Sequence, residues 1–203
     1  MKRSITLIIC LLGMLTVEAQ KKKFYPGTLV YANGKEVKAL IKTPADAGDK
    51  TIEYKLTEDG KKESASSEEL KSFTLSEGNT KFVRTAYFEM GGKKQAKYAG
   101  WFNILREGDV ILYSNNYDDF SGREVMSPAG SHDIIFLVKR TKEEVPTVIG
   151  LYFPSMMNHN QLFRKHSAEY FSDYPELAKR LEGKEFKFED IGQVVDLYNN
   201  RKK

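Results

Sequence analysis

The chain has 203 residues and a formal charge of +4, and its basic residues occur in small groups with acidic residues among them or nearby. This distribution argues against a nucleic-acid-binding protein, because such proteins usually concentrate their positive charge on one face. The single cysteine, Cys10, lies near the N-terminus, so the rest of the chain forms no disulfide and its fold must depend on packing.

Residues 1–19 have the features of a secretory signal peptide. The basic pair Lys2 and Arg3 precedes an apolar stretch, and a small-residue pattern ending at Ala19 predicts cleavage before Gln20. The apolar stretch is shorter than the roughly 20 residues of a transmembrane helix, so an uncleaved membrane anchor is the weaker alternative. We therefore expect a secreted protein, periplasmic or extracellular, whose mature chain has no cysteine and no membrane span.

Residues 20–153 predict an antiparallel β-rich domain, because apolar and polar residues alternate in many short runs. Asn33-Gly34 separates two such runs and predicts a type I′ hairpin turn, in which both central residues have positive φ. Asp59-Gly60 marks a second hairpin, and residues 64–70 have the composition of a single helical turn. The expected strands and hairpins cover 28–42, 51–56, 72–75, 81–90, 100–116, 132–140 and 145–153.

Residues 154–203 change to a helical period. Leu162, His166 and Tyr170 lie four residues apart, which predicts the packed face of one helix. A final helix is predicted by an apolar stripe at Ile191, Val194, Val195 and Tyr198. Strands followed by helices indicate an α+β fold, namely a meander of about 8–10 strands, as a sheet or open barrel, with a C-terminal helical segment packed on it.

A middle helix is predicted by its boundary residues. Asp173 and Glu176 have the spacing of a capping box, and Pro175 falls in the first turn, where its missing N–H is harmless. Gly183 suits the end of the same helix.

The chain shows no motif of a metal site, a cofactor site or a known catalytic centre. The three histidines, His132, His159 and His166, lack the close spacing of zinc ligands, and we interpret His166 as a packed residue. There is no G-x-S-x-G pentad, P-loop or G-x-G-x-x-G. We predict no metal, no cofactor and no assignable catalytic residue, although carboxylate pairs that meet only in the fold stay open.

Aromatic residues gather between positions 101 and 120, which makes them the candidate binding residues. If they are exposed, Trp101, Tyr113, Tyr117 and Phe120 would form a surface for a ligand or a protein partner. The alternative is that they fill the hydrophobic core, as most aromatic residues do.

Three stretches of the chain resemble secreted β-rich proteins of Bacteroidetes-type bacteria, a group without an assigned activity. The stretches are 27–42, 105–113 and 170–199, and the resemblance extends over roughly residues 24 to 200. The residues that carry it are Gly27, Gly34, Gly108, Leu112, Tyr113, Phe171, Pro175, Leu177, Tyr198 and Asn199. The resemblance implies an envelope location and a β-rich domain with a helical C-terminus, and it supplies no catalytic residues.

These features favour a non-enzymatic binding or structural domain of the bacterial cell envelope, with an envelope protein or a glycan as its partner and no nucleic acid. The alternative hypothesis is an envelope or polysaccharide hydrolase whose carboxylates the sequence does not single out. A cleft with two facing acidic groups, one with a shifted pKa, would favour the hydrolase.

Overall fold

The computed structural model describes residues 24–44, 46–115 and 133–201. Some sequence predictions concern residues outside these ranges, namely the signal peptide, its cleavage site at Ala19 and Gln20, and the side chains of Tyr117, Phe120 and His132.

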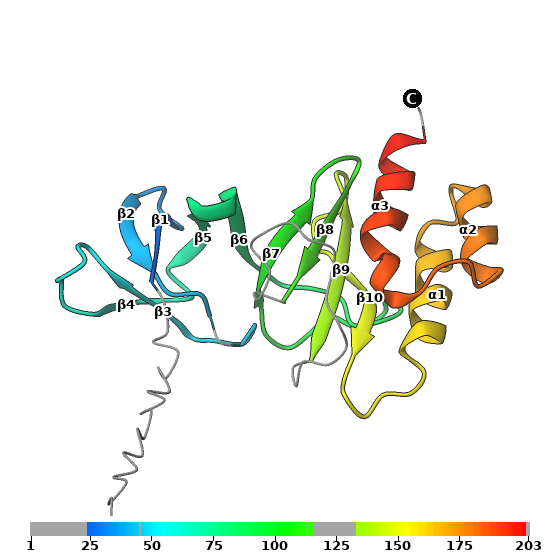
Figure 1. Ribbon diagram of the computed structural model, residues 1–203, viewed down its shortest axis with the longest axis horizontal. Helices are drawn as coiled ribbons and strands as arrows, with labels where there is room; N and C mark the ends of the chain where they lie inside the picture. Colours follow the sequence, from blue (N-terminus) through cyan, green and yellow to red (C-terminus); the bar gives the residue numbers. More distant parts are fainter. Residues whose placement is uncertain (1–23, 45, 116–132, 202–203) are drawn as a thin grey trace, which may run out of the picture.

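The described chain forms an α+β fold, with a ten-stranded antiparallel sheet followed by three helices (Figure 1). This confirms the predicted fold class. The strands are β1 (Tyr25–Tyr31), β2 (Glu36–Ile41), β3 (Thr51–Lys55), β4 (Glu63–Ser66), β5 (Leu70–Leu75), β6 (Thr80–Thr85), β7 (Gly100–Arg106), β8 (Val110–Ser114), β9 (Ile134–Arg140) and β10 (Thr147–Tyr152). A short 3-10 turn, η1 (Glu77–Asn79), joins β5 to β6.

The strand order is β10-β9-β8-β7-β6-β5-β1-β2-β3-β4, so the sheet is a meander with one exception. The first strand, β1, lies between β2 and β5, and Leu29 of β1 is paired with Phe73 of β5. This non-local pairing joins the hairpins at the start of the chain to the meander that follows. Leu29, Phe73 and Trp101 are all fully buried in the core cluster of this half of the sheet.

Two local predictions were wrong in detail. Gly34 has a φ of +84°, but Asn33 does not have positive φ, so the β1–β2 turn is not type I′. Gly34 N–H donates to the Tyr31 carbonyl (3.0 Å), and Tyr31 N–H donates to the Lys35 carbonyl (2.9 Å). This is the pattern of a three-residue hairpin loop whose third residue, Gly34, has the left-handed conformation. Residues 64–70 form the end of β4, a tight turn and the start of β5 rather than a helical turn.

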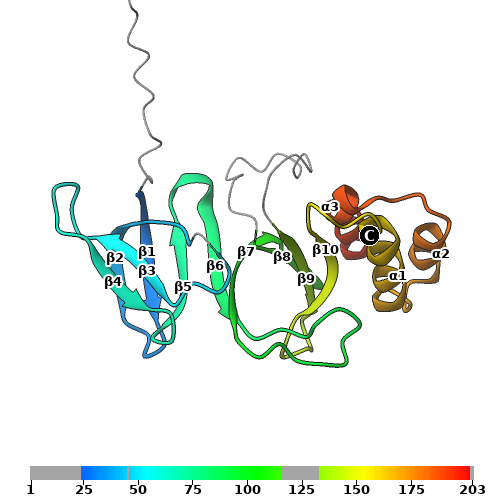
Figure 2. The same cartoon turned by 90° about the horizontal axis from the view of Figure 1, so that it is seen from below.

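The strands β6 to β10 close around a core of their own. Beyond β6 the chain continues to Phe88, which pairs in parallel with Thr147 of β10. Phe88 N–H donates to the Pro146 carbonyl (2.8 Å), and its carbonyl accepts from Val148 N–H (3.0 Å). These five strands therefore surround a cluster made by Phe102, Tyr113, Leu137 and Val148. Figure 2 shows the curvature of β7 to β10.

Three helices, α1 (His159–Tyr170), α2 (Pro175–Glu182) and α3 (Ile191–Asn200), follow the sheet, with the 3-10 turn η2 (Phe188–Asp190) before α3. They lie at the β10 end of the molecule (Figures 1 and 2) and share a core with the outer faces of β8, β9 and β10. The predicted stripe on the last helix is fully buried there, and its members are Ile191, Val194, Val195 and Tyr198. None of the described helices has both the length and the apolar character needed to cross a membrane.

Two predictions about the helices need correction. The buried face of α1 is formed by Phe163, Ser167 and Ala168, whereas His166 lies at the edge of that face and is only partly buried. Asp173 does not cap α2, because the residue at the cap position is Tyr174 and no side chain bonds the helix start. The prediction that α2 ends at Gly183 is confirmed.

Candidate functional site

The two described aromatic candidates lie in separate parts of the core. Trp101 is 0 % exposed, and its indole N–H donates to the Ser67 hydroxyl at 2.8 Å. Tyr113 is 6 % exposed and belongs to the cluster enclosed by β6 to β10. The structure therefore does not bring these two rings together on an outer surface, and Tyr117 and Phe120 lie outside the described residues.

Neither described histidine lies in a metal centre. His159 packs edge-on against the rings of Tyr152 and Phe188. His166 lies on α1 with its Nδ1 3.1 Å from a carboxylate oxygen of Glu169, one turn further along the helix. Within the described residues no group of three or more His, Cys, Asp or Glu side chains could hold a metal ion.

Arg140, at the end of β9, links the sheet to the helices. Its Nη2 is 2.8 Å from an oxygen of Asp173, and Tyr198 of α3 donates its hydroxyl proton to the other oxygen at 2.5 Å. The guanidinium lies 4.2 Å from the centre of the Tyr170 ring. Burial acts to raise the pKa of Asp173, but the hydrogen bonds from Tyr198 and Arg140 prevail and lower it. Asp173 thus connects two elements that are distant in sequence.

A cavity of about 360 Å³ lies beside this network, between α1, the β9–β10 turn and the Gly91-Gly92 turn. Two carboxylates line it, Glu143 and Glu169. Glu143 accepts the Tyr170 hydroxyl proton at 2.6 Å, and burial together with this carboxylate raises the pKa of Tyr170. Glu143 is therefore held by a structural bond, and Glu169 is paired with His166.

Within the described residues, no nucleophilic hydroxyl group is hydrogen-bonded to His166. Thr147 and Ser172 bring hydroxyl groups to the cavity, but no hydrogen bond joins either of them to His166 in the described part of the chain. A histidine–carboxylate pair can accept a proton, yet nucleophilic catalysis also needs a group within hydrogen-bond reach of that histidine. The His166–Glu169 pair lies within α1, whereas the bonds that join α1 to the sheet side of this cavity are made by Tyr170 with Glu143 and Arg140.

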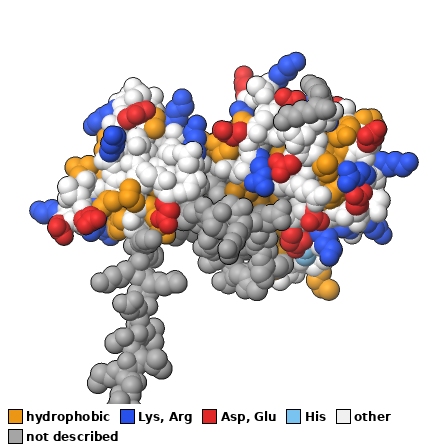
Figure 3. All heavy atoms as spheres, turned by 45° about the horizontal axis from the view of Figure 1, so that its top comes forward, with side chains coloured by type: hydrophobic (Ala, Val, Ile, Leu, Met, Phe, Trp, Pro, Cys, Tyr) orange, Lys and Arg blue, Asp and Glu red, His pale blue; other side chains and the backbone are white. Residues whose placement is uncertain are grey.

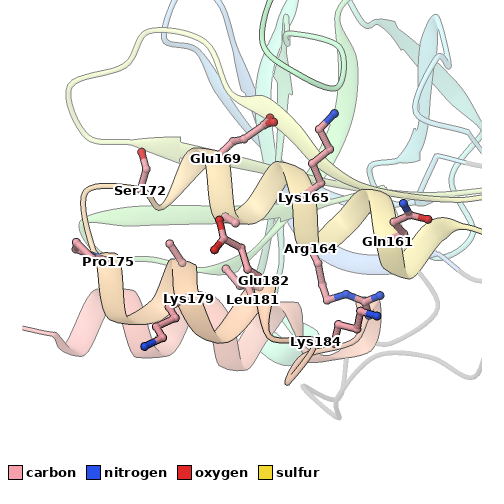
Figure 4. Close-up of a pocket in the computed structure, with 12 residues that line it drawn as sticks. Gln161, Arg164, Lys165, Glu169, Ser172, Pro175, Lys179, Leu181, Glu182 and Lys184 are labelled. Carbon is pink, nitrogen blue, oxygen red and sulfur yellow. The ribbon is translucent and has the colours of Figure 1, made fainter.

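The larger feature is an open groove of about 1130 Å³ between α1 and α2 (Figure 4). We call it the α1–α2 groove. Its apolar floor is formed by Ala168 and Leu181, which are buried, and by Ala178 and Pro175. Its polar rim is formed by Gln161, Arg164, Lys165, Glu169, Ser172, Lys179, Glu182 and Lys184. The groove thus combines an apolar base with charged edges.

The rim carries more basic than acidic side chains. In Figure 4, Lys165 and Lys179 project from opposite edges, and Arg164 and Lys184 point towards the same end of the groove. Within the described residues, none of the three lysines of the rim has an ion pair. By contrast, the face shown in Figure 3 has basic and acidic side chains interspersed over the molecule. The rim of the α1–α2 groove therefore has a small excess of basic over acidic side chains, and its lysines are without an ion pair in the described part of the chain.

The α1–α2 groove was not predictable from the sequence, because its lining comes from the polar faces of two amphipathic helices. On α1, Gln161, Lys165 and Glu169 lie four residues apart, which places them on one face. A polar face normally indicates exposure to solvent and nothing more. The available signal was the small residue on each helix, since Ala168 comes one turn after Arg164 and Lys165, and Ala178 directly precedes Lys179.

The comparisons with known proteins supply no relative. No protein-family model matches the chain, and neither the curated proteins nor the solved structures show a significant match.

Proposed function

We propose that this protein is a non-enzymatic binding domain of the bacterial cell envelope and that the α1–α2 groove is its partner-binding surface. One observation carries the proposal, namely an open groove of about 1130 Å³ with an apolar floor and unpaired basic side chains on its rim. Concave surfaces that combine apolar area with a few oriented polar groups are typical of binding sites. The two described rings of the aromatic cluster, Trp101 and Tyr113, are buried and offer no comparable surface.

The envelope location in this proposal is supported by the signal-peptide pattern of residues 1–19 and by the resemblance to secreted bacterial proteins. An exported protein meets envelope proteins and glycans rather than nucleic acids. Its partner is therefore an envelope component.

Binding is favoured over hydrolysis by the charge environment of the carboxylates. A glycoside hydrolase needs a carboxylic acid whose pKa is raised, so that the acid is protonated near neutral pH. Among the described residues, the carboxyl groups with a shifted pKa have it lowered: hydrogen bonds from Lys42 lower the pKa of Glu53, and those from Arg180 lower the pKa of Glu185. Asp173 is likewise lowered by its bonds to Tyr198 and Arg140. None of these carboxylates is prepared to act as a general acid.

The proposal is tested by affinity capture with matched charge variants. The mature protein, the groove variant K165E/K179E and the control variant K38E/K61E are immobilised and exposed to an envelope extract and to a glycan array. Lys38 and Lys61 are exposed lysines in the other half of the sheet, so both variants carry the same change in net charge. All three proteins should have the same melting temperature.

We expect a component that is retained by the wild type and the control but lost from the groove variant. Quantitative mass spectrometry or array fluorescence measures that difference. If the groove variant retains everything that the control retains, the α1–α2 groove is not the binding surface and the proposal fails.

A further inference from the structure

We infer that the α1–α2 groove accepts a short acidic polypeptide segment with an apolar side chain at its centre, an inference that rests on the proposed function. Three properties of the groove support this partner chemistry: its length, its apolar floor and the order of charges around it.

The groove is short. Its wall on one side is α2, whose eight residues span about 12 Å at a rise of about 1.5 Å per residue. An extended chain advances about 3.3 Å per residue, so roughly four residues of a partner lie along the groove. This length matches a linear peptide motif and is small for the face of a folded domain.

The floor provides room for an apolar side chain. Ala168 of α1 and Ala178 of α2 end at Cβ, so the two helices leave space above the buried Leu181, and the accessible apolar surface of the floor comes from Ala178 and Pro175. Pro175 closes one end of this floor with a further apolar ring. A leucine- or phenylalanine-sized side chain of the partner would leave water by resting on this floor. No aromatic ring is among the described residues that line the groove, so a sugar ring or a nucleic-acid base has none on which to stack.

The rim favours carboxylates on the partner. Lys165 and Lys179 extend from the two opposite edges, so acidic residues on either side of the central apolar residue can each reach one ammonium group. Both lysines are exposed. Ion pairs at exposed positions are individually weak and are screened by salt, so we expect modest affinity that depends on ionic strength.

Two acidic residues of the groove exclude a dense polyanion. Glu182 lies between the two helices, and Glu169 projects from the α1 edge (Figure 4). A sulfated glycan or an anionic lipid surface would place negative charge against both. A peptide avoids this conflict, because its backbone N–H groups can donate hydrogen bonds to Glu182 while its acidic side chains contact the lysines.

The inference is tested with labelled hexapeptides measured by fluorescence anisotropy. One series has acidic residues flanking a central Ala, Val, Leu, Ile, Met or Phe, and a second series has lysines in place of the acidic residues. A third peptide keeps the acidic residues and has serine at the centre. Heparin and phosphatidylglycerol vesicles are the polyanion probes, and each probe is titrated with wild type, K165E/K179E and K38E/K61E.

We expect members of the acidic series with a large apolar centre to bind more tightly than the lysine series and the serine peptide. Binding should weaken about tenfold in K165E/K179E, the size expected for two exposed ion pairs, and in high salt, but not in K38E/K61E. Equal binding of acidic and basic peptides, or no loss in the groove variant, would overturn the inference, as would tighter groove-dependent binding of heparin or vesicles.

The two proposals fail in different ways. If the groove variant loses an envelope partner in the capture experiment but no acidic peptide binds to the wild type, the peptide inference is wrong and the proposed function stands. If capture of every envelope component is the same for the wild type and the groove variant, the proposed function is wrong, and the peptide inference that rests on it is wrong as well.

Discussion

The packing of Phe188 gives the most direct test of how the helices are attached to the sheet. Phe188 lies in η2, is 3 % exposed and is surrounded by four rings. Its ring centre is 4.9 Å from Phe136, 5.9 Å from His159, 6.1 Å from Tyr152 and 6.2 Å from Phe163. Replacing it with alanine leaves a cavity where the sheet, α1 and the segment before α3 meet.

The expected cost of Phe188→Ala is about 3–5 kcal/mol in the free energy of unfolding, the usual range for a buried phenylalanine. This is a large part of the total stability of a typical domain, about 5–15 kcal/mol. For a chain of this size, 1 kcal/mol corresponds to about 2–4 °C, so the melting temperature should fall by about 6–20 °C. The matched control is Tyr98→Ala, which removes an aromatic ring that is 70 % exposed and should change stability by about 0.5 kcal/mol or less.

Urea denaturation should be followed by two signals. Far-UV circular dichroism reports the helices, and the fluorescence of the single tryptophan, Trp101, reports the other core. Both signals should shift to lower urea together, because β6 and β7 contribute to both halves of one continuous sheet. A shift in circular dichroism without a shift in Trp101 fluorescence would refute this reasoning, as would a loss of less than about 1 kcal/mol.

Three further predictions follow from the described contacts and from the sequence. Ser67→Ala removes the acceptor of the Trp101 indole N–H in a buried site and should cost about 1–3 kcal/mol in urea denaturation, whereas unchanged stability would show that this bond is dispensable. Burial, with a smaller effect of Glu107, raises the pKa of Tyr113 to about 12, so this phenol should stay neutral when unfolded tyrosines ionise near pH 10. The contribution of Tyr113 to stability should be complete below about pH 10 and should decrease between pH 10 and 12. An ultraviolet titration of the wild type against Tyr113→Phe measures the ionisation of this phenol. A difference spectrum that titrates near pH 10 would contradict the raised pKa. Mass spectrometry of the protein exported from bacterial cells should find Gln20 as the first residue, and an intact residue 1 in the exported fraction would contradict the signal-peptide prediction.

Much of the β-rich fold was predictable because hairpin signals are local. The hairpin of β7 and β8 was predicted between residues 100 and 116, and it forms with its turn at residues 107–109. The Asn33-Gly34 hairpin also forms, although the turn type was wrong, since Asn33 lacks positive φ. Alternation identifies a strand but leaves its neighbour undetermined, and this is why the pairing of β1 with β5 was not anticipated.

The candidate site was less predictable than the fold. Asp173 has the spacing of a capping residue, but its bonds to Arg140 and Tyr198 depend on the approach of β9 and α3. Trp101 and Tyr113 are close in sequence, yet alternation and the curvature of the sheet direct them into different cores. Groups that meet only after the chain folds leave no fixed spacing in the sequence.

The sequence by itself determined the order of strands before helices, most of the hairpins and the apolar stripe of α3, because each depends on contacts between residues near one another in the chain. It also carries the export signal that we predict at residues 1–19. Only the tertiary structure decided where the first strand is inserted, which face of α1 is buried and where the α1–α2 groove opens. These features arise from packing between distant segments, in which the gain from burying apolar surface outweighs local preference.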